Sequence, residues 1–210
     1  MDGLVTNVSL ISGVGGGGGS QHAIVLTGLA GLAAGAFSMA AGEYVSVSSQ
    51  NELIAAEVDK ERHELKHNAV AEQAELAGML RKRGVSAATA QQAAAEISQN
   101  PDKALTIHAM EELGVNPTEL PSPVVAAAAS LASFAVGAVI PLLPYLLGFD
   151  ALGVALGLAA LAAVIGGGLV ARMTNRPFWR GAARQLILGA FAAGITYLIG
   201  LGVGGLATGG

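Results

Sequence analysis

The stretch Val124–Leu147, VVAAAASLASFAVGAVIPLLPYLL, runs for 24 residues without a charged side chain. A helix needs about 20 apolar residues to cross the hydrocarbon core of a bilayer. This stretch therefore predicts a transmembrane helix. It also contains Pro141 and Pro144, which a membrane helix tolerates where its neighbours satisfy the freed carbonyl groups.

Further charge-free runs lie at both ends of the chain. Two of them, Ala151–Ala171 and Leu186–Leu206, are each long enough to span a bilayer. No charged residue separates Asp2 from Glu43, and the glycine-rich residues 13–22 divide that region into a helix at about 2–14 and a second at about 23–47. The first is short for a span. No basic region precedes it, which predicts that there is no cleavable signal peptide.

The composition agrees with a membrane protein. Hydrophobic residues make up 52% of the 210 residues and charged residues only 12%, against about 25% charged in a typical globular domain. There is no cysteine, so thiolate metal sites are excluded. We predict an all-α membrane protein with five transmembrane helices and a polar insert between helices 2 and 3. The predicted parts are residues 1–49, 50–118 and 119–210.

The insert contains residues that typically begin and end helices, and their positions predict three or four short helices. Gly84 is a helix stop, Ser86 can cap the next helix, Asn100-Pro101 opens another, and Gly114 ends it. Seven of the eleven basic residues lie in this insert. The other four are arginines between the last two spans, so the distribution predicts that the insert faces the cytosol.

Acidic residues of the insert fall into two pairs, Glu61 with Glu64 and Glu72 with Glu75. Residues three apart share a helix face, and all four share one stripe if the helix is continuous. If it breaks near His67-Asn68, two helices each offer one pair. One interpretation is a solvated face with salt bridges. The other is a divalent-metal site, because clustered carboxylates repel one another and a cation relieves that repulsion.

The residues His63-Glu64-Leu65-Lys66-His67 match the H-E-x-x-H zinc-protease pattern. A catalytic zinc site needs a third protein ligand, and the extended form of the motif is missing. Glu64 and His67 also form a Glu-x-x-His element, but the second such element of a di-iron carboxylate protein is absent. We therefore expect neither a protease nor a ferroxidase, and we predict that the protein is not an enzyme.

Three residues in or near the predicted spans have side chains that can bind a metal. Glu43 lies near the end of the second span, with Met39 one turn earlier on the same face, and Asp2 lies in the first. Ionisable residues inside spans commonly mark a transport path. The alternatives are a Glu43 side chain that reaches the interface, core packing for Met39, and a solvated N-terminus for Asp2.

Three segments carry a family resemblance: DGLVTNVSLISGV (residues 2–14), GAFSMAAGEYVSVSSQNEL (35–53) and EELGV (111–115). With them the chain resembles the vacuolar iron transporter family over nearly its whole length. In that family further residues precede the Asp-Gly pair, whereas here only Met1 does. By this comparison we expect either that the true start lies upstream of Met1 or that the first helix is N-terminally truncated.

The resemblance implies a homodimer that exports iron(II), and often manganese(II), in exchange for protons. It places Asp2, Met39 and Glu43 on the transport path. It implies an insert that binds metal through a set of five glutamates: Glu61, Glu64, Glu72, Glu75 and Glu112. Family members carry methionines shortly before the last of these, where this chain offers His108 and Met110 as candidate replacements.

We therefore expect a transporter that exports iron(II) from the cytosol. The alternative is a membrane-anchored metal buffer or sensor that transports nothing. The expected partners are divalent metal ions, protons, the lipid bilayer and a second copy of the chain. We expect no prosthetic group and no nucleic-acid partner. The lack of a sorting segment and the compact loops favour a prokaryotic plasma membrane over a vacuole.

Overall fold

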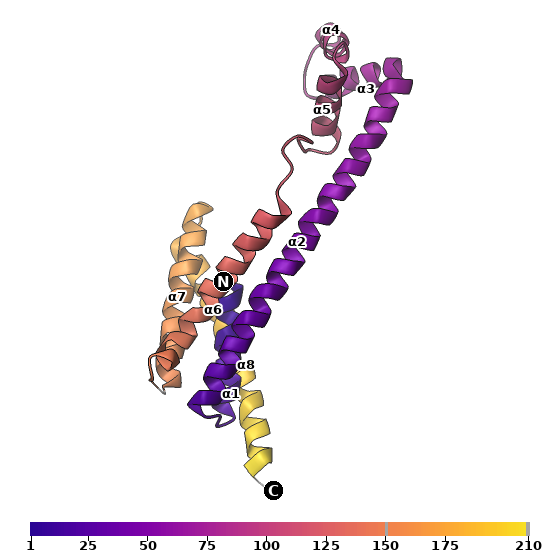
Figure 1. Ribbon diagram of the computed structural model, residues 1–210. Coiled ribbons are helices and arrows are strands. Elements are labelled where there is room, and N and C mark those ends of the chain that lie inside the picture. Colours follow the sequence, from indigo (N-terminus) through magenta and orange to yellow (C-terminus); the bar gives the residue numbers. More distant parts are fainter. Residues whose placement is uncertain (150, 209–210) are drawn as a thin grey trace. The chain divides into compact units, whose positions relative to one another are not determined.

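A computed structural model describes residues 1–149 and 151–208. This part of the chain is helical, with eight α-helices and no strand (Figure 1). The chain divides into two compact units. One consists of Met1–Glu43 with Ala127–Gly210, and the other is Tyr44–Ala126. We describe each by itself.

Four helices are long and apolar enough to cross a membrane. They are α2 (Gln21–His67), α6 (Pro123–Leu146), α7 (Leu152–Met173) and α8 (Phe178–Thr208). The expected remaining span is α1 (Asp2–Gly16), which has 15 residues. At 1.5 Å per residue it is about 22 Å long, short of the roughly 30 Å hydrocarbon core. The chain is therefore a multi-pass membrane protein, with four helices of spanning length and α1 packed among them.

Glycine allows these helices to approach closely. A Cβ on Gly200 of α8 would collide with the carbonyl oxygen of Gly13 in α1, and a Cβ on Gly181 of α8 would collide with that of Gly167 in α7. Contacts of this kind, backbone against backbone, drive helix association in a solvent as apolar as the helices themselves.

The expected end of the second helix at about Val47 is wrong. The helix α2 continues to His67 as one element of 47 residues. Residues 48–67 turn polar but contain neither glycine nor proline, and they are rich in good helix formers such as Glu, Ala, Leu and Lys. The change in polarity marks where apolar sequence ends, not where the helix ends.

The rest of the second unit contains three short helices, α3 (Ala69–Lys82), α4 (Ala87–Ser98) and α5 (Pro101–Glu112). The predicted caps are confirmed: Ser86 Oγ accepts from Thr89 N at 3.3 Å, and Asn100 Oδ1 accepts from Lys103 N at 3.1 Å. The break after His67 is also present. The side chain of Asn68 makes no capping hydrogen bond, and its main-chain carbonyl accepts from Ala71 N and Glu72 N at the start of α3.

Candidate metal centre

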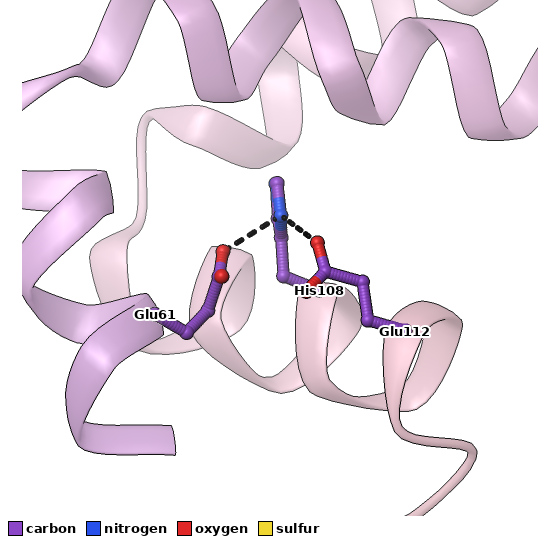
Figure 2. Close-up of side chains that lie close together, drawn as sticks. All are labelled: Glu61, His108 and Glu112. Atoms are coloured by element: carbon purple, nitrogen blue, oxygen red, sulfur yellow. Dashed lines mark ion pairs between the residues drawn. The ribbon is translucent and has the colours of Figure 1, made fainter. Parts of the chain in front are cut away.

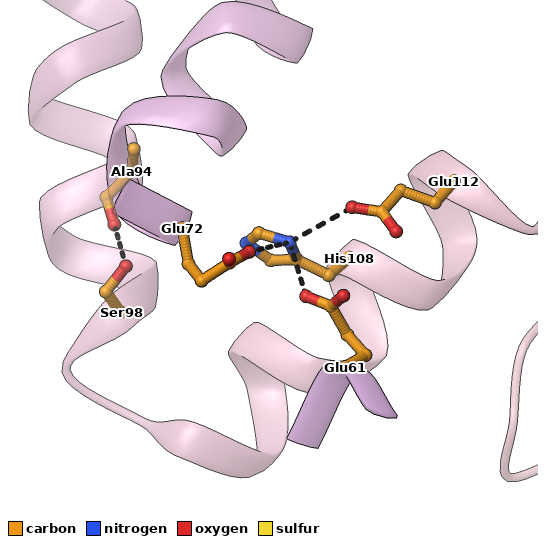
Figure 3. Close-up of polar contacts among 6 residues, drawn as sticks. All are labelled: Glu61, Glu72, Ala94, Ser98, His108 and Glu112. Carbon is orange, nitrogen blue, oxygen red and sulfur yellow. Dashed lines mark hydrogen bonds and ion pairs between the residues drawn. The ribbon is translucent and has the colours of Figure 1, made fainter. Parts of the chain in front are cut away.

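Three helices of the second unit bring acidic side chains and one imidazole together (Figure 3), and Figure 2 shows the part of this group formed by Glu61, His108 and Glu112. Glu61 comes from the end of α2, Glu72 from the start of α3, and His108 and Glu112 from adjacent turns of α5. Apolar contacts hold α5 in this place. Leu105 and Ala109 pack against Val58 on α2. On the other side, Ile107 packs against the cluster that contains Leu76.

The imidazole of His108 is at the centre of the group (Figure 3). Its Nδ1 lies 2.9 Å from Glu61 Oε1, 3.6 Å from Glu112 Oε1 and 3.7 Å from Glu72 Oε2. There are two sets of three residues in which the potential ligand atoms all lie within 4.8 Å of one another. One is Glu61, His108 and Glu112, and the other is Glu61, Glu64 and Glu72, so Glu61 belongs to both.

Three members of this group are buried although they are polar, whereas Glu112 and Glu64 are exposed. His108 is fully buried, and Glu61 and Glu72 are 7% and 5% exposed. Glu61 Oε1, Glu72 Oε2 and both ring nitrogens of His108 lack an aligned hydrogen-bond partner. Glu61 Oε1 and His108 Nδ1 are close but not aligned to form such a bond. Buried polar atoms are nearly always hydrogen-bonded, and the exceptions need an explanation such as an ion.

Burial and mutual repulsion make these carboxyls hard to ionise. Burial, followed by the charges of Glu112 and Glu72, raises the pKa of Glu61 to about 7. Burial and then the charge of Glu75 raise the pKa of Glu72, while His108 opposes that shift. A divalent cation among the oxygens would remove both causes, since it supplies the missing countercharge.

The donor set indicates the class of metal. Carboxylate oxygens accompanied by an imidazole nitrogen suit the borderline divalent ions, such as iron(II), manganese(II), cobalt(II) and zinc(II). Calcium and magnesium prefer sites made of oxygen alone. A redox-inert or redox-active ion would fit the same ligands, so the site identifies a group of metals and not one member.

The structure does not bring all of the sequence-predicted residues together. Glu64 is exposed but joins the second set of ligands, and Glu75 acts on its neighbours only through its charge. Met110 is 48% exposed, so of the two candidates on α5 it is His108 that reaches the group. Glu111, next to Glu112 in sequence, is engaged elsewhere in an ion pair with Arg83 at 2.8 Å.

The predicted transport residues lie in the first unit and form no such cluster among the described residues. Asp2 and Glu43 are exposed at the surface of the single chain. Met39 is 39% exposed, and Phe37 and Tyr44 on the same helix are 70% and 47% exposed. An α2 surface of this kind is available to lipid or to another protein chain.

The H-E-x-x-H pattern does not form a zinc site. The rings of His63 and His67 stack on each other with centroids 4.0 Å apart, and His67 Nδ1 lies 2.8 Å from the carbonyl oxygen of His63. Both residues are exposed, and neither belongs to a group of potential metal ligands in the described residues. Only Glu64 of the motif points toward the buried group.

Sequence reasoning missed one polar residue in the membrane unit. Asn7 is fully buried in α1, where its Nδ2 donates to the carbonyl oxygen of Ala138 in α6 at 2.6 Å. Its Oδ1 has no hydrogen-bond partner and faces Gly31 of α2. The available signal was an amide within an otherwise apolar run, where a polar group is costly to bury.

Spanning helices joined to a helical unit with a buried carboxylate–imidazole group define a membrane protein that handles divalent metal ions. Comparison with known sequences is more specific. Residues 1–201 match the VIT family. The chain is 37% identical over 186 residues to a vacuolar iron transporter of Acanthamoeba castellanii, covering 86% of this chain and 70% of that protein.

Two plant proteins show a similar relationship. Identity is 34% over 208 residues to vacuolar iron transporter homolog 1 of Oryza sativa subsp. japonica, covering 93% of this chain and 67% of that protein. Identity is 27% over 201 residues to vacuolar iron transporter 1 of Arabidopsis thaliana, covering 94% of this chain and 80% of that protein. The chain belongs to the VIT family, as its motifs indicated. These relatives are named for the vacuole and give no support to the expected prokaryotic plasma membrane.

Proposed function

We propose that this protein exports iron(II), and manganese(II) as a second substrate, from the cytosol in exchange for protons. The observation that carries the proposal is the group around His108. Glu61, Glu72 and His108 are buried with polar atoms that lack aligned partners, and the exposed Glu112 lies beside them. Relatives named as iron transporters support iron as the transported metal. The insert captures the cation, and the spans carry it across the membrane.

Met39, Glu43 and Asp2 form the path in this proposal. Met39 and Glu43 lie on α2, the same helix that carries Glu61 and Glu64. A thioether with two carboxylates is a suitable ligand set for iron(II) and manganese(II). We propose that a second copy covers the exposed α2 surface, so that the path runs between two subunits with α1 as the fifth membrane helix.

Protonation of Asp2 and Glu43 from the far side would release the cation there and couple its export to inward movement of protons. Metal ligands must lose their protons to bind, so a cation and protons compete for the same oxygens. The insert would face the cytosol, as the distribution of basic residues predicts.

The test is manganese(II) and iron(II) flux into proteoliposomes, with and without a pH gradient. Flux of the unchanged protein is expected to require the gradient. Asp2→Asn and Met39→Leu should abolish it without weakening metal binding by the insert. Met173→Leu is the matched control, because Met173 is 83% exposed at the end of α7. Gradient-independent flux would refute the exchange mechanism.

One observation favours the alternative of a metal buffer or sensor. Among the described residues, the groups of three potential ligands lie only in the second unit. A buffer would bind metal with the same affinity but move none. Intact metal binding with no flux in proteoliposomes, with or without a gradient, would favour that alternative.

A further inference from the structure

The end of α7, the start of α8 and the connection between them carry a concentrated positive charge that the proposed transport does not use. The arginines of this region, which we call the arginine turn, are Arg172 in α7, Arg176 in the connection, and Arg180 and Arg184 in α8. All four are exposed, and none forms an ion pair in the described part of the chain. No acidic residue follows Asp150 in the sequence, so α7, α8 and the connection between them contain no acidic residue that could pair with these arginines.

The arginine turn lies directly next to two membrane spans. The helix α7 ends at Met173 and α8 begins at Phe178, and both are of spanning length. The charge-free runs 151–171 and 186–206 lie on either side of the four arginines. Because a charged side chain is expensive inside the hydrocarbon region, the guanidinium groups must lie at the level of the lipid headgroups.

Packing fixes the shape of the turn. Phe178 lies against Gly168 of α7, where a Cβ would collide with its ring. The guanidinium carbon of Arg172 lies 5.9 Å from the centroid of the Phe178 ring. Arg176 N donates to the carbonyl oxygen of Ala171 at 2.8 Å, next to Asn175 with a φ of +53°. The main chain that carries these arginines is therefore well defined before any ligand binds.

An aromatic side chain accompanies the charges. Trp179 is 75% exposed, and its ring meets that of Phe178 edge to face at 5.4 Å. An exposed tryptophan at the end of a span is typical of the membrane interface, where its apolar ring and its N–H group are both accommodated. It is also the only tryptophan in the sequence.

We propose that the arginine turn binds the phosphate of anionic phospholipid headgroups. All four basic residues here are arginine, whereas four of the seven in the insert are lysine. Lysine would be sufficient to orient the spans, since orientation depends on charge alone. The planar fork of arginine matches phosphate with two parallel hydrogen bonds, which indicates recognition of a phosphate group.

Trp179 allows a direct test on the full chain in mixed micelles. Its fluorescence would be quenched by phosphatidylserine or phosphatidylcholine brominated on the acyl chains, each titrated at increasing mole fraction. Each arginine is expected to strengthen binding roughly fivefold. The variant Arg176→Gln/Arg180→Gln/Arg184→Gln should therefore weaken binding of the anionic lipid roughly a hundredfold, seen as a large rise in the half-quenching fraction.

Two further variants serve as controls. Arg81→Gln/Lys82→Gln/Lys103→Gln removes the same charge from exposed sites in the insert and should leave quenching unchanged. Replacing Arg176, Arg180 and Arg184 with lysine keeps the charge but loses the paired hydrogen bonds, so it should weaken binding by no more than about tenfold, less than the glutamine variant. The glutamine variant should give the size-exclusion profile of the unchanged protein, which excludes misfolding as the cause of its weaker binding.

The proposal predicts stronger quenching by the anionic lipid than by the zwitterionic one at equal mole fraction. Equal quenching by the two lipids would overturn it, as would an equal loss in the insert control. A lysine variant as weak as the glutamine variant would show that charge does not hold the lipid. Inorganic phosphate that alone reproduces the fluorescence change would assign the site to a soluble phosphate and overturn the lipid assignment.

Discussion

The pKa of Glu61 makes metal capture sensitive to pH near neutrality. The carboxyl has a pKa of about 7, so about nine tenths of it is ionised at pH 8 and about one tenth at pH 6. Only the ionised form binds metal. Affinity should therefore fall about tenfold from pH 8 to pH 6, and more if Glu72 gains a proton as well over this range. A glutamate of ordinary pKa would lose only a few per cent over the same range.

The perturbation that isolates this effect is Glu61→Gln. Amide oxygen remains a weak ligand, but the charge is gone. At pH 8 we expect the variant to bind manganese(II) at least about tenfold more weakly, the lower limit for a charge-assisted contact. Between pH 8 and pH 6 its affinity should change much less than that of the unchanged protein, because the group that titrates has been removed.

Calorimetric titration of manganese(II) into the purified full chain at pH 8, 7 and 6 provides the measurement. Glu52→Gln is the matched control, since Glu52 is an exposed carboxylate on the same helix. It should reproduce the pH profile of the unchanged protein. A flat profile for the unchanged protein would refute the reasoning, and so would an equally steep profile for Glu61→Gln.

Three other outcomes follow from the structure. The same glutamine substitution should stabilise the metal-free insert at pH 8, measured as slower hydrogen exchange in α5. The reason is that folding raises the pKa of Glu61 from 4.5 to about 7. Its carboxyl therefore contributes stability to the folded insert that is complete below about pH 4.5 and is lost as pH rises through about 7. Gly200→Leu should prevent folding in membranes because its side chain would meet Gly13, whereas Gly202→Leu enters open space and should not, as judged by size-exclusion profiles. His108→Ala should lower manganese(II) affinity at least about tenfold, while His63→Ala/His67→Ala should leave calorimetric affinity unchanged.

The membrane helices could be predicted because their sequences leave only one solution. A charge-free run of 24 residues such as Val124–Leu147 has no other stable environment. The caps at Ser86 and Asn100 were also predictable, since each depends on a few neighbouring residues. The end of α2 was not, because its polar half continues the helix without any local stop.

The metal centre could be predicted only in part. Spacing placed Glu61 and Glu64 on one helix face, which is a local property. That His108 completes the group depends on how α5 packs, and this is set by the contact of Leu105 and Ala109 with Val58. The H-E-x-x-H pattern was not informative for the same reason, because local spacing does not specify tertiary packing. Its spacing gives a shared helix face but does not say whether that face points toward solvent or toward the buried group.

The raised pKa values bear on how a capture site can release its cargo. A fully ionised cluster of carboxylates would bind a divalent cation tightly and release it slowly. In this insert the metal-free Glu61 is about half protonated at pH 7. Metal binding would then displace about half a proton from Glu61 on average, which would offset part of the attraction and keep capture reversible at constant pH. Under the proposed function, reversible capture would let the cation move on to Glu43 and Met39, and burial of the carboxyls would then serve transport better than storage.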